Sequence, residues 1–74
     1  MSKLKIITCL QMCRLLEKQG FIVARQSGGS HRYFRHPDGR TTIMAIHSGD
    51  MKRSIIRKIL NDIGMTIDEY NEKM

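Results

Sequence analysis

Several residues whose side chains could act together on a phosphodiester lie around a short run of serine and glycine. His31 directly follows residues 27–30, and three arginines flank it: Arg25, Arg32 and Arg35. An imidazole with an ordinary pKa of about 6.5 can give or take a proton at neutral pH, and guanidinium groups bind phosphate oxygens. Serine and glycine permit a tight turn and the close approach of another chain. This combination is typical of a site that binds phosphate and moves a proton.

The strand that carries His31 decides which neighbours share its face. A strand over 31–36 alternates its side chains, with His31, Tyr33 and Arg35 on one side and Arg32, Phe34 and His36 on the other. Because Phe34 is the better core residue, we expect the second side to be buried and His31 to point outward. The adjoining strands carry apolar residues on both sides, so coverage of both faces, one of them by a partner, is the alternative.

A first helix and three strands are predicted around the histidine. Thr8 with Gln11 three residues later predicts a capping box, and Gly20 is a stop signal after the apolar stripe. Strand patterns cover 21–26, 31–36 and 41–46, and a Pro-Asp-Gly turn at 37–39 separates the last two. The short connections favour antiparallel pairing.

A second helix and a short final helix complete the prediction. An apolar stripe over 56–63 lies between Asp50, a predicted N-cap, and the stop residue Gly64. Thr66 and Glu69 predict a capping box for a short extra C-terminal helix. The resulting class is α+β, with two helices packed on one face of a three-stranded antiparallel sheet. This α-β-β-β-α order is that of the double-stranded-RNA-binding fold.

The charge of the chain indicates an anionic partner. Thirteen Lys and Arg residues oppose 7 Asp and Glu, giving a net charge of +6. Such a balance favours nucleic acid, an acidic protein or an anionic membrane surface. A basic surface that is only solvated is the alternative.

Length and composition indicate the number of domains, the location of the chain and its need for a cofactor. The 74 residues predict one domain spanning 1–74. No stretch approaches the roughly 20 apolar residues that cross a bilayer, and the apolar run at the N-terminus is too short for a signal peptide. We therefore expect no membrane association, a cytoplasmic location and reduced thiols at Cys9 and Cys13. The histidines and cysteines match no standard zinc spacing, so no metal or other cofactor is predicted.

Basic residues also mark the start of the second helix. Lys52 and Arg53 lie in its first turn, and Arg57 follows one turn later. Cations there oppose the helix dipole, whereas a helix N-terminus with added lysine and arginine suits phosphate. In double-stranded-RNA-binding folds this helix end faces phosphates. We predict that these three residues contact RNA, with a solvated basic turn as the alternative.

Four ordered pieces of the chain resemble the HicA family of toxins from toxin–antitoxin pairs. They are LLEKQGF at 15–21, RQ at 25–26 followed by GSH at 29–31, RHPDGR at 35–40, and IRKIL at 56–60 followed by IGMT at 63–66. The pieces occur in the family's order from about residue 15 to the C-terminus.

The resemblance implies a metal-independent, ribosome-independent endoribonuclease (an mRNA interferase) that a HicB-type antitoxin blocks. The family's catalytic histidine follows Gly-Ser, which is the position of His31 here. Two features depart from the family pattern. The serine–glycine turn is one residue longer and lacks a lysine that many members have. The proline that the loop before the second helix often carries is absent between His47 and Ile55. The longer turn bears on how His31 is presented.

Taken together, the residues and the resemblance assign His31 as general acid or base in RNA cleavage and Arg25, Arg32 and Arg35 as phosphate contacts. A second proton-transfer group is left open among His47, Tyr33 and Ser30. The alternatives are a non-catalytic double-stranded-RNA-binding module, a decayed toxin that acts only through protein binding, and an interaction domain for an acidic partner.

Overall fold

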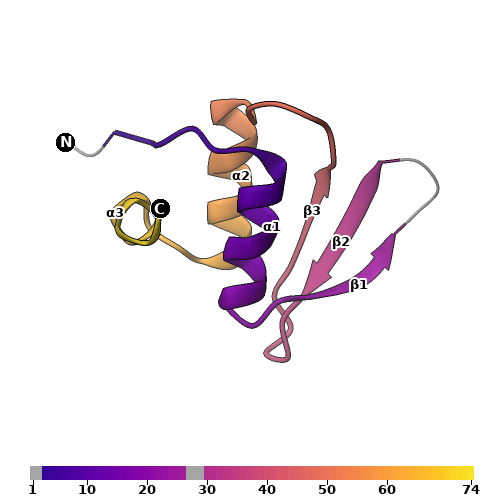
Figure 1. Cartoon of the computed structure of the whole chain (residues 1–74). Coiled ribbons are helices and arrows are strands. Elements are labelled where there is room, and N and C mark those ends of the chain that lie inside the picture. The colour runs from indigo at the N-terminus through magenta and orange to yellow at the C-terminus, as the bar shows by residue number, and fades with distance from the viewer. Residues whose placement is uncertain (1–2, 27–29) are drawn as a thin grey trace.

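A three-stranded antiparallel sheet with helices on one side forms the architecture. The computed structural model describes residues 3–26 and 30–74. Its elements are α1 (Cys9–Lys18), β1 (Ile22–Gln26), β2 (His31–Arg35), β3 (Thr41–Ala45), α2 (Arg53–Ile63) and α3 (Ile67–Lys73). The strands lie in the order β1-β2-β3. Figure 1 shows α1 and α2 on one side of the sheet, whereas the other side is uncovered. The predicted α+β class is confirmed, and each strand is one residue shorter than predicted.

The first helix begins and ends where its sequence signals lie. The Thr8 hydroxyl accepts a hydrogen bond from the Gln11 N–H at 3.2 Å, and the Gln11 side chain accepts from the Thr8 N–H at 2.9 Å. After the last turn, Gly20 has φ +94°, which a glycine adopts readily. This turn lets the Phe21 N–H bond the Leu16 carbonyl at 2.9 Å and directs the chain into β1.

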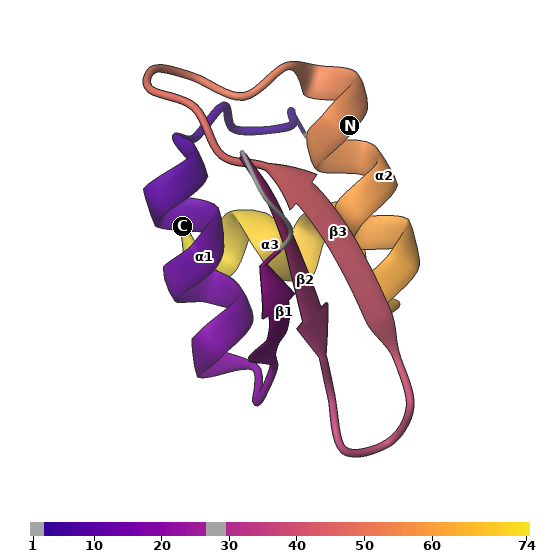
Figure 2. The same ribbon diagram turned by 90° about the vertical axis from the view of Figure 1, so that its right-hand side faces the viewer.

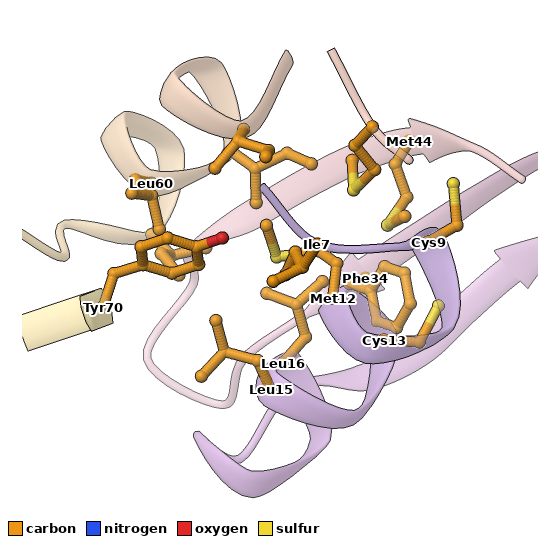
Figure 3. Packing of buried hydrophobic residues seen from close by; sticks show 14 of the residues in the cluster. Ile7, Cys9, Met12, Cys13, Leu15, Leu16, Phe34, Met44, Leu60 and Tyr70 are labelled. Carbon is orange, nitrogen blue, oxygen red and sulfur yellow. The ribbon is translucent and has the colours of Figure 1, made fainter. Parts of the chain in front are cut away.

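The buried residues of the strands face the helices. Phe34 is fully buried, and Thr42 and Met44 are buried beside it on β3. Phe34, Met44 and residues of α1 belong to one apolar cluster, part of which is drawn in Figure 3. The preceding residue, Tyr33, is 40% exposed. The expectation that Phe34 marks the buried face is therefore confirmed.

The Pro-Asp-Gly turn between β2 and β3 is confirmed and is fixed by Arg40. The Arg40 Nε donates to the Asp38 carboxylate at 2.7 Å, and its guanidinium lies 5.2 Å from the centroid of the Phe21 ring. Another guanidinium nitrogen donates to the Ile63 carbonyl at the end of α2. The backbone N–H of Arg40 holds the pKa of Asp38 below its usual value. One side chain thus joins the turn, the start of β1 and the end of α2.

The prediction that Asp50 is the N-cap of the second helix is wrong. Helix α2 starts at Arg53 with Lys52 as N-cap, and no side chain caps it. The Met51 N–H donates to the Ile7 carbonyl at 2.9 Å, and Asp50 pairs with Thr8 in an isolated bridge. Because Met51 is also buried, the backbone at residues 50–51 is held extended and the helix begins later.

The last helix closes the core from the side away from the sheet, as Figure 1 shows. The predicted capping box between Thr66 and Glu69 is present, and Tyr70 is fully buried. The Tyr70 hydroxyl donates to the Lys5 carbonyl at 2.6 Å. Burial raises the pKa of Tyr70 to about 12. This contact attaches the segment before α1 to α3.

Candidate active site

His31 is the first residue of β2, and the backbone around it is well anchored. It pairs with Ala45 of β3, and the Ser30 carbonyl accepts a hydrogen bond from the Ile46 N–H at 2.6 Å. The Cys9 thiol donates to the Ala45 carbonyl at 3.5 Å. His31 is exposed. The sheet therefore holds the backbone of His31 in place and leaves its imidazole accessible to a ligand. The preceding residues of the predicted turn, 27–29, lie outside the described residues.

The uncovered side of the sheet, called the open face below, places several candidate residues around His31. Tyr33 and Arg35 follow on β2 at alternate positions, each about 6.8 Å further along the strand. Cross-strand pairing adds the remaining residues, since directly paired residues share a face. The open face therefore comprises Ile22, Arg25, His31, Tyr33, Arg35, Thr41, Ile43 and Ala45.

Arg25 reaches the open face because β1 is irregular. The pairing register shifts between Val23, which faces Phe34, and Arg25, which faces Tyr33. A strand without this irregularity would place Val23 and Arg25 on the same side, because they are two residues apart. The extra residue, Ala24, moves Arg25 to the opposite face. The pairing thus puts Arg25 and Arg35 on the same face of the sheet as His31.

Arg32 lies on the other side of the sheet. It is partly buried, and its Nη1 donates to the Cys13 sulfur of α1 at 3.7 Å. Burial raises the pKa of the Cys13 thiol, and the nearby Arg32 charge opposes this rise. The buried Nε of Arg32 has no hydrogen-bond partner among the described residues. The structure does not place this arginine with His31.

The basic residues of α2 are exposed, but they project from the helical layer. Lys52 is the N-cap, Arg53 is the first helical residue and Arg57 lies one turn later. The N-terminus of α2 and the start of β2 lie at the same end of the molecule in both Figure 1 and Figure 2. Arg57 lines a shallow hollow of about 390 Å³ with Asn61 and Met65. Lys52 and Arg53 therefore add positive charge at the end of the molecule where β2 begins, whereas Arg57 lies further along α2.

The candidates for a second proton-transfer group lie close to His31 in the sequence or in the sheet. Tyr33 shares its face, and Ser30 precedes it. His47 is exposed and follows Ala45, the partner of His31, by two residues. The Nδ1 of His47 lies 2.9 Å from the Ser48 carbonyl and donates to it. In the neutral ring this leaves Nε2 as the nitrogen with a free lone pair.

The side chain of His36 makes packing and turn contacts. Its ring packs edge-on against Phe21 with 5.1 Å between the centroids, and its Nδ1 accepts from the Asp38 N–H at 3.1 Å.

In residues 3–26 and 30–74, no cluster of His, Cys, Asp and Glu could hold a metal ion. None of the helices in this part of the chain combines the length and the apolar character needed to span a membrane.

A comparison with models of protein families assigns the chain to a family. A family model described as HicA toxin of bacterial toxin-antitoxin matches residues 11–65. This span covers 55 of the 74 residues and runs from α1 to the residue after Gly64. It includes every candidate site residue named above. No curated protein sequence matches the chain.

Proposed function

The chain belongs to the HicA toxin family of bacterial toxin–antitoxin systems, and from this premise we propose that it is an endoribonuclease that cleaves mRNA without a metal ion. Membership of the family makes the chain a toxin with an antitoxin partner. The observation that supports the proposed chemistry is the open face, where an accessible His31 lies on the same side of the sheet as Arg25 and Arg35.

RNA supplies its own nucleophile for this reaction. His31 acts as the general base that takes the proton of a 2′-hydroxyl, or as the general acid that protonates the leaving 5′-oxygen. The 2′-oxygen attacks the adjacent phosphorus and the bond to the 5′-oxygen breaks, which gives a 2′,3′-cyclic phosphate and a 5′-hydroxyl. General acid–base catalysis of this kind contributes about 10²- to 10⁴-fold in rate.

The arginines of the open face supply positive charge where negative charge develops. Arg25 and Arg35 contact the phosphate that is attacked or its neighbours, because guanidinium groups bind phosphate oxygens in a bidentate way. Lys52, Arg53 and Arg57 bind the RNA backbone away from the cleaved bond. Arg32, predicted from the sequence as a phosphate contact, has no such role in this proposal, because its side chain lies on the helix side of the sheet against Cys13.

Among the three candidates we propose His47 as the second proton-transfer group, because it is exposed and follows the cross-strand partner of His31 by two residues. Its Nδ1 is occupied by the Ser48 carbonyl, so the neutral ring presents Nε2 as a base and the protonated ring presents it as an acid. Tyr33 and Ser30 are the other candidates. Tyr33→Phe keeps the ring and removes only the hydroxyl, so unchanged cleavage by this variant would exclude Tyr33 from proton transfer.

The antitoxin is proposed to be of the HicB type and to inhibit by covering His31. An exposed imidazole on an uncovered sheet can be blocked by any protein that packs on this face, without a change in the toxin's fold. We propose a cytoplasmic location, since this is where mRNA, the proposed substrate, is present.

Growth of a bacterial host tests the proposed function. The wild-type chain is induced beside His31→Ala at matched expression, and the folding of both is confirmed by circular dichroism. We expect arrest with the wild type, growth with His31→Ala, and RNA ends that carry a cyclic phosphate and a 5′-hydroxyl. Arrest by both proteins would refute the role of His31. Growth with both folded proteins would favour a non-catalytic RNA-binding module or a decayed toxin.

A further inference from the structure

Tyr33 occupies the middle of the open face, with a shallow hollow toward each neighbouring strand. Toward β1 it lines a hollow of about 320 Å³ with Arg25 and Arg35. Toward β3 it lines a second hollow of about 220 Å³ with Thr41 and Ile43. The side chain is 40% exposed although it belongs to the central strand. Its ring therefore offers an apolar surface between two spaces that a planar group could enter.

The charge of this face suits a polyanion. The three strands contain no aspartate or glutamate, whereas Arg25 and Arg35 both lie on the open face. Asp62 of α2 lines the second hollow, and its carboxylate already accepts hydrogen bonds from Thr42 and Lys58, each at 3.0 Å. An anionic ligand on the open face thus meets arginine with little opposing charge.

We infer that the open face binds single-stranded RNA and that a base stacks on Tyr33 next to the phosphate at His31. This inference rests on the proposed function, and it specifies the form of the substrate and a positioning residue. Sheets that bind single-stranded nucleic acid combine exposed aromatic rings with basic side chains that hold the backbone. Here the ring of Tyr33 lies between the imidazole of His31 and the guanidinium of Arg35 along β2.

A duplex does not fit this arrangement. The bases of an RNA duplex are paired and stacked on one another, so none can lie on Tyr33 without being extruded. A duplex bound as in double-stranded-RNA-binding folds would instead lie against helical residues, with its phosphates near the start of α2. The position of His31 on the open face requires the cleaved strand to cross the side opposite the helices. The stacking ring then holds the strand in register with the histidine.

Binding measured in the His31→Ala background tests this inference without cleavage. The probe is a short, unstructured, fluorescently labelled oligoribonucleotide, compared with the same sequence as a duplex, by fluorescence anisotropy at fixed salt. We expect the single strand to bind more tightly than the duplex. Tyr33→Ala should weaken single-strand binding by about 5- to 150-fold, because one stacked base is lost. Tyr33→Phe, which keeps the ring, should stay within about 2-fold of the parent.

Leu10→Ala is the matched control, since Leu10 is a large apolar side chain of α1 that is 61% exposed. It should not change the affinity. Equal or tighter binding of the duplex would overturn the inference. Unchanged single-strand affinity in folded Tyr33→Ala would also overturn it, and would leave the open face to a protein partner.

The two proposals fail separately. If His31→Ala still cleaves RNA but Tyr33→Ala loses single-strand affinity, the role of His31 is refuted and the inference stands. If His31 is required for cleavage but Tyr33→Ala binds RNA normally, the proposed function stands and the inference is refuted.

Discussion

Replacing two adjacent residues of β2 should test which face of the sheet is open. Phe34 is fully buried and Tyr33 is 40% exposed. Truncation of a fully buried phenylalanine to alanine destabilises a protein by about 3–5 kcal/mol. Truncation of the exposed Tyr33 removes mainly cross-strand contacts with its neighbours and should reduce the free energy of unfolding by about 1 kcal/mol or less. The expected gap between the two variants is thus about 2–4 kcal/mol.

The absolute stability of the protein decides how this gap is measured. A domain of this size has on the order of 3–5 kcal/mol, so Phe34→Ala should leave most of the chain unfolded. Phe34→Leu keeps much of the buried volume, should cost about 1–1.5 kcal/mol, and gives a folded variant for comparison. Urea unfolding followed by circular dichroism, in the His31→Ala background, gives the free energies of unfolding of Phe34→Leu and Tyr33→Ala. For Phe34→Ala, the circular dichroism signal without urea gives the fraction that remains folded.

Equal destabilisation by Phe34→Ala and Tyr33→Ala would refute the assignment of faces. It would mean that Tyr33 is covered to the same degree as Phe34. His31, which lies on the same side as Tyr33, would then not be available to RNA, and both proposals would lose their structural basis.

Two further predictions concern the packing that supports the sheet. Tyr70→Phe removes the hydrogen bond to the Lys5 carbonyl and should lower the free energy of unfolding by about 1–2 kcal/mol in urea titrations. The pKa of Tyr70 is raised to about 12 in the folded state, so the contribution of this phenol to the free energy of unfolding is complete below about pH 10 and is lost as the pH rises through 12. The wild type should therefore lose more stability than Tyr70→Phe over this range. Parallel losses would contradict the burial of the phenol. Gly20→Ala and Gly39→Ala both place a side chain at positive φ, but only at Gly20 would the new Cβ lie 3.0 Å from the His36 ring, so Gly20→Ala should lower the melting temperature more. A larger loss for Gly39→Ala would contradict the packing of His36 at this turn.

Local signals in the sequence were sufficient for most of the secondary structure. Both predicted capping boxes, at Thr8 and at Thr66, are present, and α2 ends at Gly64 as predicted. These features depend on hydrogen bonds between residues three or four positions apart, so the sequence contains all the participants. The strand that carries His31 was also predictable, because a single large apolar residue, Phe34, determines which of its faces is buried.

The start of α2 depended on contacts that no local pattern contains. Asp50 has the chemistry of an N-cap, yet Met51 is buried and its N–H bonds to Ile7. This contact joins residues more than forty positions apart, and it holds the backbone extended where the local signal favours a helix start. A tertiary contact therefore moved the helix start to Arg53.

The sequence by itself determined that His31 begins a strand and that arginines lie near it along the chain. It favoured an outward-facing His31, with coverage of both faces as the alternative, and the burial of Phe34 decided this point. The tertiary structure decided which arginines share its face. Alternation predicts the facing of a residue only within a regular strand, and the irregularity at Ala24 moves Arg25 to the open face. Packing of α1 on the sheet placed Arg32 against Cys13 instead. Both outcomes depend on the pairing of strands and the docking of a helix, which are set by the whole core and not by neighbouring residues.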